Sequence, residues 1–386
     1  MDINDILIHL GEERSNYYNA VSPPVIQSTN FVFDSIETFR ESFQNELGHH
    51  LYTRGNNPTV EILRKKIAAL EKSEDALITG SGAAAVAIAV IANLSKGDHA
   101  LVVNNPYSWT YKLFTQFLSR FGIEYDFVDG TDLSEIEKGV KENTKLLFLE
   151  SPNSVTFELQ DLRACADIAR ANNLVTVIDN SYSSPLYQNP FDLGIDLVVH
   201  SGTKYINGHS DVVCGMVCGS KEMINKIFLS EYMTLGTIIS PSDAALIIRG
   251  LRTLSIRMER IKNTTEKLLE YLSGHEKVKK IYYPFDQSNP QIEIAKKQML
   301  AGTGLFSILL NTDSKKDVYK FVEQLDKFLI AVSWGGHESL MMPFISFHDV
   351  PGRDDHFVDW RLIRFSVGLE DPEYLIRDLD QAFEVF

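Results

Sequence analysis

The sequence Leu197-Val198-Val199-His200-Ser201-Gly202-Thr203-Lys204-Tyr205 places a lysine just beyond a short run of β-branched residues. Such a run, bounded by serine, glycine and threonine, is typical of a buried strand that ends in a turn. A lysine after a strand most often lies at the surface. It can also form an imine with an aldehyde, because its surroundings can lower its pKa and leave the amine neutral. The hydroxyls of Ser201 and Thr203 precede it and could contact an anionic group of a ligand.

Polar residues also stand at the ends of two expected strands that precede Lys204 in the sequence. Residues 77–86 contain the turn Gly80-Ser81-Gly82, which enters an apolar helix. Free N–H groups at a helix start favour an anion, although such turns are also common without a ligand. The expected strand at residues 174–178 is followed directly by Asp179. Its carboxylate either caps the next turn or holds a ring nitrogen of a cofactor protonated.

Helical stretches alternate with short β-branched runs between residues 58 and 220, which predicts a mostly parallel sheet covered by helices. The expected strands are residues 75–79, 100–103, 145–149, 174–178 and 197–199. Ligands of such sheets bind beyond the carboxyl ends of the strands. Ser81, Asp179 and Lys204 follow three of these ends in chain order, where they suit a phosphate, a pyridinium nitrogen and an aldehyde carbon. Together they predict pyridoxal 5'-phosphate (PLP) as the cofactor. The turn lacks the spacing of a nucleoside-triphosphate loop or a dinucleotide fold.

The length of 386 residues suits two domains, since single hydrophobic cores rarely exceed about 250–300 residues. We expect an N-terminal arm at 1–50, a PLP-binding large domain at 51–249 and a smaller C-terminal domain at 250–386. The arm is predicted from Pro23-Pro24 and from the absence of steady periodicity around it. Arms of this kind often reach a neighbouring subunit.

The composition excludes several classes of function. A net charge of −15 makes nucleic acid an unlikely partner, because binding to a phosphate backbone needs a positive surface. The three cysteines give no disulfide framework and indicate packing in a reducing compartment. No histidine or cysteine set has the spacing of a metal site. The N-terminus lacks the pattern of a signal peptide, and no apolar run is long enough to span a membrane, so we expect a cytoplasmic protein.

Residues 201–211 resemble the cofactor-lysine motif of the cysteine and methionine metabolism PLP enzymes. This family, of fold type I, includes cystathionine β-lyase, cystathionine γ-synthase, cystathionine γ-lyase and methionine γ-lyase. Further matches to its motifs lie at residues 52–59, 150–152, 249–254, 333–340 and 364–371. The resemblance covers almost the whole chain. It implies an α/β fold in which a large domain with a mostly parallel sheet is followed by a smaller C-terminal α/β domain.

The resemblance also implies roles for individual residues. Lys204 is implied to hold PLP as a Schiff base and to move protons, and Asp179 to pair with the pyridinium nitrogen. Tyr107 matches the catalytic aromatic that stacks on the ring, although the following Ser108-Trp109-Thr110 departs from the family's usual Gly-Gly-Thr. The implied phosphate ligands are Ser81, Gly82, Ala83, Ser201 and Thr203, completed by Tyr52 and Arg54 of a neighbouring subunit.

The same resemblance implies a homotetramer with shared active sites, in which Tyr52 also takes part in catalysis. Arg364, helped by Ser333, is implied to clamp the carboxylate of a sulfur amino acid through its planar guanidinium. Trp334 is the third implied substrate-binding residue. Simpler alternatives are that Trp334 is packing and that Arg364 only pairs with Glu370.

Departures from the family pattern bear on the reaction. Val332 occupies a position where γ-acting members commonly place an acid, and the Ser333-Trp334 that follows resembles bacterial cystathionine β-lyase. Trp109 stands where methionine γ-lyases usually carry a cysteine. β-Elimination from cystathionine is therefore favoured over γ-elimination, γ-replacement or a general cysteine-S-conjugate lyase. A catalytically silent relative is disfavoured, because both Lys204 and Asp179 are present.

Overall fold

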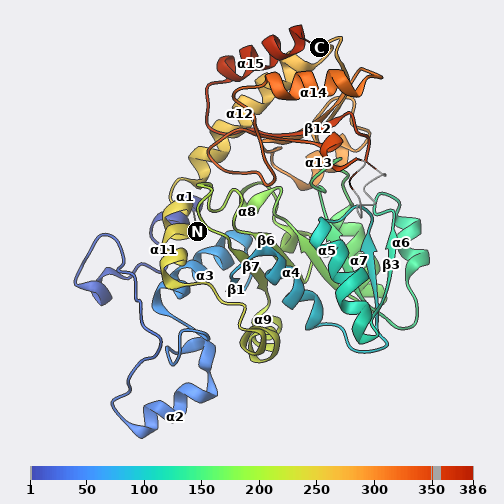
Figure 1. Cartoon of the computed structure of the whole chain (residues 1–386). Helices are drawn as coiled ribbons and strands as arrows, with labels where there is room; N and C mark the ends of the chain where they lie inside the picture. Colours follow the sequence, from blue (N-terminus) through green and yellow to red (C-terminus); the bar gives the residue numbers. More distant parts are fainter. Residues whose placement is uncertain (1, 349, 351–357, 386) are drawn as a thin grey trace.

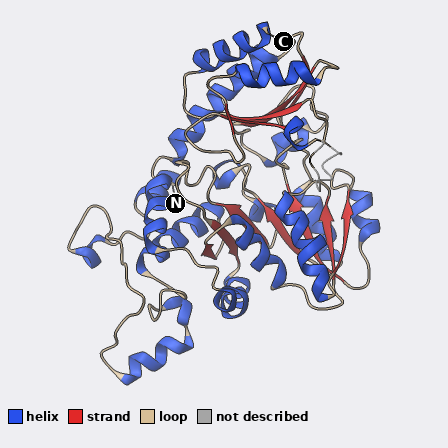
Figure 2. Ribbon diagram, in the orientation of Figure 1, coloured by secondary structure: helices blue, strands red, loops and turns tan. Residues whose placement is uncertain are grey.

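The computed structural model describes residues 2–348, 350 and 358–385. Its ribbon consists of a larger and a smaller α/β part, with a helical extension near the N-terminus that reaches away from both (Figure 1). Strands form the centre of each α/β part and helices lie on the outside (Figure 2). This layering follows from the alternation of strand and helix patterns along the chain.

The larger part contains a seven-stranded sheet in the order β1-β7-β6-β5-β4-β2-β3. Its strands are β1 (Asp75–Thr79), β2 (His99–Val103), β3 (Glu124–Val128), β4 (Thr144–Glu150), β5 (Val175–Asp179), β6 (Leu197–Ser201) and β7 (Gly215–Gly219). Only β7 runs antiparallel to its neighbours, β1 and β6. The predicted α/β class with a mostly parallel sheet is thereby confirmed. The list of expected strands omitted β3, an edge strand whose residues are mostly half-buried, and the buried strand β7.

Helices cover both faces of this sheet, so its central strands are apolar on both sides. Val177 and Val199 pack on the face covered by α4 (Gly82–Ile91) and α9 (Lys221–Ile227). Ile178 and Val198 pack on the opposite face, which is covered by α3 (Pro58–Glu71), α7 (Leu162–Ala171) and α11 (Pro241–Leu251). The alternation places neighbouring residues of each strand end on opposite faces.

The long helix α12 (Leu254–Leu272) leads into the smaller part, and its last turns belong to the core of that part. The smaller part contains a five-stranded sheet in the order β10-β11-β12-β9-β8. The strands are β8 (Val278–Tyr282), β9 (Leu305–Leu310), β10 (Leu329–Ile330), β11 (Leu340–Pro343) and β12 (Leu362–Ser366). The helices α12, α14 (Lys315–Gln324) and α15 (Pro372–Glu384) contribute to a second apolar core with this sheet. Strand β12 is central, so a polar residue on it can be held rigidly.

The N-terminal residues divide into a docked helix and an extension. Helix α1 (Ile3–Ile8) buries Ile6 and Leu7, and the buried Lys66 of α3 donates hydrogen bonds to their carbonyls at 3.0 and 3.1 Å. The expected arm therefore begins only after this helix. A six-residue helix carries too little periodicity to be read from sequence. Helix α2 (Ile36–Gln44) lies in the extension, far from either sheet (Figure 1).

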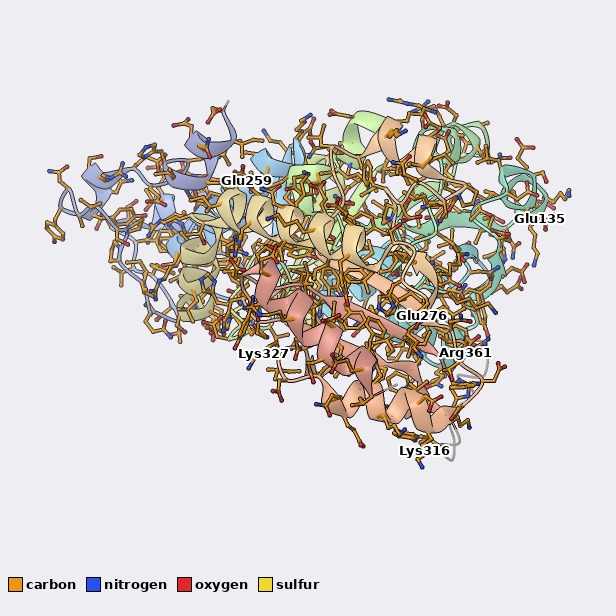
Figure 3. The ribbon with its side chains drawn as sticks, turned by 90° about the horizontal axis from the view of Figure 1, so that it is seen from above. Glu135, Glu259, Glu276, Lys316, Lys327 and Arg361 are labelled. Carbon is orange, nitrogen blue, oxygen red and sulfur yellow. The ribbon has the colours of Figure 1, made fainter. Side chains whose placement is uncertain are left out.

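Charged side chains lie around the outside of the molecule. In the view from above, Glu135 and Lys316 lie at its rim (Figure 3). Within the described residues, no helix is both long and apolar enough to cross a membrane. The same part of the chain contains no cluster of histidine, cysteine or acidic side chains that could hold a metal ion.

Candidate active site

Lys204 lies in a tight turn that follows β6. The turn is closed by backbone hydrogen bonds from Lys204 to the Ser201 carbonyl (3.1 Å) and from Asn207 to the Gly202 carbonyl (2.9 Å). The Nζ atom donates a hydrogen bond to the Ser333 hydroxyl and lies 5.3 Å from the centre of the Trp334 ring. Burial, and after it the positive charge of Arg364, lower the pKa of Lys204 to about 8, against an opposing effect of Asp179. Such an amine is partly neutral near neutral pH, as a nucleophile or proton acceptor must be.

The reaction of the cofactor-free protein with PLP is expected to quicken as pH rises and to level off above about pH 8. Only the neutral amine attacks an aldehyde, and the pKa of Lys204 is lowered to about 8, so the amine is protonated below that value and neutral above it. Stopped-flow absorbance measures the rate, with Nα-acetyl-lysine as the reference for titration of PLP itself. Arg364→Met, which removes the neighbouring positive charge, should move the midpoint upward. A wild-type midpoint near that of the free lysine would contradict the prediction.

Asp179 ends β5 and is held inside the sheet edge. Its carboxylate accepts a hydrogen bond from the Ser181 N–H at 2.9 Å. Burial raises the pKa of Asp179, while the Ser181 hydrogen bonds and the charges of His200 and Lys204 lower it. In the part of the chain that the structure describes, no basic side chain forms an ion pair with this carboxylate. A partly buried acid that lacks a directly paired cation suits the pyridinium nitrogen of PLP.

The turn before α4 is built closely against the end of β6. Ser81 caps the helix, because its hydroxyl accepts a hydrogen bond from the Ala84 N–H at 3.1 Å. The first-turn N–H groups, including those of Gly82 and Ala83, have no acceptor within the helix. A Cβ atom on Gly82 would lie 2.7 Å from that of Ser201, so the close approach requires glycine. This cradle of free N–H groups beside the Ser201 hydroxyl suits a phosphate.

The Thr203 hydroxyl is engaged with β7 in this structure. It donates a hydrogen bond to the Cys214 carbonyl at 3.2 Å and accepts one from the Cys214 N–H at 2.9 Å. The Cys214 side chain is buried and its thiol is free. Contact of Thr203 with a phosphate therefore stays a prediction, as do the other implied phosphate contacts.

Tyr107 is positioned by a residue to which the sequence reasoning gave no role. Glu150 ends β4 and pairs in register with Asp179 on β5. Its carboxylate accepts hydrogen bonds from the Tyr107 N–H at 2.7 Å and from the Ser154 N–H at 3.2 Å. Burial and the neighbouring Asp179 raise the pKa of Glu150 to about 8. The rule that drew attention to Asp179, a polar residue at a strand end, also applies to Glu150.

The Tyr107 ring is half-buried and faces the same charged groups. Its pKa is raised by burial first and then by the negative charges of Asp179 and Glu150, whereas Arg364 lowers it. These interactions bring Tyr107, Asp179 and Arg364 into one site. A ring at this place can stack on a planar cofactor that reaches from Lys204 to Asp179.

Arg364 projects from the central strand β12 of the smaller part and is buried. Its guanidinium donates hydrogen bonds to the Ser154 carbonyl at 3.0 Å and to the Ser333 carbonyl at 3.3 Å. Burial lowers the pKa of Arg364 to about 10. No carboxylate of the described residues forms an ion pair with it, so the pairing with Glu370 that the sequence left open is absent there. The guanidinium also donates to the Met342 sulfur at 3.6 Å. A buried guanidinium held by neutral acceptors suits a carboxylate ligand.

Ser333 and Trp334 connect this arginine to Lys204. Ser333 has a positive φ of 78°, an unusual backbone conformation for a serine, and its side chain accepts the hydrogen bond from Lys204. The Trp334 ring is buried and packs against Tyr205 with the ring centres 5.3 Å apart. Trp334 thus forms part of the wall behind Lys204, whereas Val332 before it is 71% exposed.

Tyr52 and Arg54 lie at the base of the extension. The Arg54 guanidinium lies 5.1 Å from the centre of the Tyr52 ring, and the Tyr52 ring is 43% exposed. Within the described residues, neither forms a hydrogen bond or an ion pair with the side chains around Lys204. The structure therefore brings together Lys204, Asp179, Tyr107, Ser333 and Arg364 but does not bring Tyr52 or Arg54 to them.

Comparisons with known proteins show what the whole chain is similar to. A family model described as Cys/Met metabolism PLP-dependent enzyme matches residues 4–384. The chain is 38% identical over 383 residues to an L-methionine gamma-lyase of Fusobacterium nucleatum subsp. polymorphum, covering 98% of this chain and 96% of that protein. It is 35% identical over 382 residues to cystathionine beta-lyase MetC of Bacillus subtilis (strain 168), covering 98% and 95%. A crystal structure of metB from Corynebacterium glutamicum superposes with a TM-score of 0.92 and 34% identity, covering 100% of this chain and 98% of that chain.

Proposed function

Because the chain belongs to the Cys/Met metabolism PLP-dependent enzyme family, we propose that it is a PLP-dependent carbon–sulfur lyase whose main reaction is β-elimination from cystathionine. The observation that carries the proposal is the buried Arg364 beside Lys204 and Ser333. This arrangement places a group that can bind a carboxylate next to the Lys204 amine, whose pKa is lowered to about 8. An amino acid held by Arg364 presents its Cα to that amine.

Each residue of the site has a separate role in the proposed β-elimination. When bound between Lys204 and Asp179, PLP supplies a conjugated ring that stabilises negative charge at the substrate Cα. Arg364 and Ser333 hold the α-carboxylate, and Lys204 takes the proton from Cα and returns one to the leaving sulfur. Cleavage of the Cβ–S bond of cystathionine releases homocysteine. The remaining 2-aminoacrylate takes up water and gives pyruvate and ammonia.

The preference for β-elimination rests on Val332. This side chain is 71% exposed and directly precedes Ser333. γ-Elimination requires a further proton removal at Cβ and a group that relays it, and an apolar valine offers no such group. Trp109, exposed at the start of α5 (Ser108–Lys112), likewise carries no acid or thiol.

Incubation with cystathionine is expected to give pyruvate and homocysteine. Methionine should be turned over at least roughly a hundredfold more slowly, which corresponds to about 2.7 kcal/mol in transition-state stabilisation. Identification of the keto acid by chromatography is the measurement, and Val332→Glu should narrow the gap between the substrates, with Val332→Gln as the uncharged control. Formation of mainly 2-oxobutyrate and cysteine from cystathionine would overturn the β-lyase proposal.

Methionine γ-lyase is the second candidate, because relatives with that activity are 38% identical to this chain. The same assay separates this activity from cystathionine β-lyase. A methionine γ-lyase would convert methionine to 2-oxobutyrate at a rate comparable to its rate with cystathionine. Cysteine as a third substrate tests a general β-lyase, which would release pyruvate and sulfide.

We further propose a homotetramer, supported by large apolar side chains that the extension leaves exposed. They include Val32 at 95% and Ile36 at 76% exposed, and Phe43 on α2 is also exposed. Uncovered apolar groups gathered on one segment are typical of a surface that another protein covers. Tyr52 and Arg54 lie where the extension joins α3, so a docked extension would carry them to another subunit. The cytoplasm remains the proposed compartment, since all three cysteines are free, buried thiols.

Mixing two inactive variants is expected to restore part of the activity. Arg54→Ala chains keep Lys204, and Lys204→Ala chains keep Arg54, so a hybrid assembly contains sites with both residues intact. Chains denatured and refolded together are assayed against each parent refolded alone. Mixtures as inactive as either parent would show that each site is built within one chain.

A further inference from the structure

Glu71 and His200 form a buried pair that has no part in the reaction described above. His200 Nε2 lies 2.5 Å from Glu71 Oε1, and both side chains are inaccessible to solvent. Glu71 belongs to the last turn of α3, and His200 lies on β6 between Val199 and Ser201. The pair therefore lies against the end of the strand that leads to Lys204.

Hydrogen bonds connect this pair to the end of β5. Asn180, the residue after Asp179, donates a hydrogen bond from Nδ2 to Glu71 Oε1 at 2.9 Å. The side chain of Gln188 donates to Asn180 Oδ1 at 2.9 Å and to the Ser151 carbonyl at 2.8 Å. All of these groups are buried. The network fixes Glu71 and the backbone beside Asp179 relative to each other.

The contact with Glu71 gives His200 a partner for a positive charge. A buried carboxylate is costly unless a cation or a proton neutralises it, and within the described residues Glu71 forms an ion pair only with His200. Its Oε1 atom accepts from two donors, which suits an ionised carboxylate. The charge of His200 also acts on Asp179, a partly buried carboxylate, and lowers its pKa. One imidazole thus lies within reach of two acids.

We propose that His200 carries a proton held by Glu71, and that this imidazolium keeps Asp179 ionised and the pyridine nitrogen of bound PLP protonated. Glu71 and His200 are then positioning residues that act on the cofactor through Asp179. The charges alternate from Glu71 through His200 and Asp179 to the ring nitrogen. The inference rests on PLP binding at Asp179 and does not depend on which carbon–sulfur bond is cleaved.

The other titratable groups near the pair do not supply this charge. Burial and the neighbouring Glu71 raise the pKa of the Cys218 thiol on β7, so the thiol stays neutral. Asp179 is also influenced by Lys204, but the charge of that amine changes as it takes up and gives away protons in the reaction. Glu150, next to Asp179 in the sheet, adds negative charge if it ionises. His200 is thus the cation that remains available to Asp179 throughout.

The test compares the protonation of the ring nitrogen in wild type and Glu71→Gln. Glutamine keeps the size and the hydrogen-bonding reach of the side chain but removes the charge that holds the proton on His200. The 15N chemical shift of bound 15N-labelled PLP is followed from pH 6 to 9, and the dissociation constant of PLP is measured by equilibrium dialysis. The wild-type nitrogen should stay protonated, whereas the variant should lose its proton about one pH unit or more earlier and bind PLP roughly tenfold more weakly.

Two controls separate charge from structure. Gln188→Met disturbs the same buried network without changing any charge, so it should lower the melting temperature and leave the 15N profile unchanged. The double variant Glu71→Gln/His200→Gln is neutral and retains paired side chains, so it should reproduce the profile of Glu71→Gln. If Glu71→Gln fails to fold, the 15N shifts of the wild-type His200 imidazole decide alone, with both ring nitrogens expected to be protonated at pH 7.5.

Three outcomes would overturn the proposal. The first is a Glu71→Gln profile that coincides with wild type while only the melting temperature falls, and the second is a Gln188→Met profile as shifted as that of Glu71→Gln. The third is a neutral His200 imidazole in the wild type. Failure of the proposed lyase activity would be seen separately, in the product assay with wild-type protein and cystathionine.

Discussion

Replacement of Lys204 by alanine is expected to abolish covalent attachment of PLP and to lower kcat/KM by at least about 10⁴-fold. Proton transfer by a positioned side chain is worth up to roughly 10⁴-fold, and the variant also loses the amine that holds the cofactor. The measurements are steady-state kinetics with cystathionine and the visible absorption of the purified protein.

Borohydride reduction followed by peptide mapping locates the attachment. Wild-type protein should be yellow and should carry the label on Lys204, and Lys204→Ala should carry none. Lys66 provides a matched buried control, because its amine is fully buried but engaged with α1 and Glu12. Lys66→Met should lower thermal stability and still give the label on Lys204. Label on another lysine in the wild type would refute the assignment.

Replacement of Arg364 by leucine is expected to lower kcat/KM roughly 30- to 4000-fold, mainly through a higher KM. Removing one partner of a buried, hydrogen-bonded charge pair costs about 2–5 kcal/mol, and here the missing partner leaves the substrate carboxylate unpaired. Arg364→Lys keeps the charge but not the planar fork, so its loss should be smaller. Kinetics with cystathionine measure both variants.

The neighbouring arginine provides the control for this prediction. Arg361 lies just before β12, on the outside of the smaller part, and its guanidinium forms an ion pair with Asp359 at 2.7 Å (Figure 3). Arg361→Leu should leave KM unchanged, since its guanidinium is engaged at the surface. A normal KM in Arg364→Leu, or an equal rise in Arg361→Leu, would remove Arg364 from the carboxylate site. Circular dichroism checks that both variants are folded.

Local sequence was sufficient to predict the strand that ends at Asp179 and the strand that precedes Lys204. A β-branched run buried on both faces specifies its strand through its own side chains, and the polar residue that follows marks the strand end. The edge strand β3 was omitted because half-buried residues produce a weaker pattern. Helix α1 was included in the expected arm because it docks through contacts distant in sequence, among them the hydrogen bond from Lys66, roughly sixty positions away.

The sequence by itself determined the α/β class, the family and the residues that follow the strand ends, because each depends on a pattern within a few neighbouring positions. The tertiary structure alone decided which of these residues meet. Glu150 lies beside Asp179 through the order of the strands, and Glu71 reaches His200 across 129 positions. Lys204 contacts Ser333 across the same separation, and Arg364 contacts Ser154 across 210. Such pairs are set by sheet order, by register and by the packing of the smaller part on the larger, which local propensities do not encode.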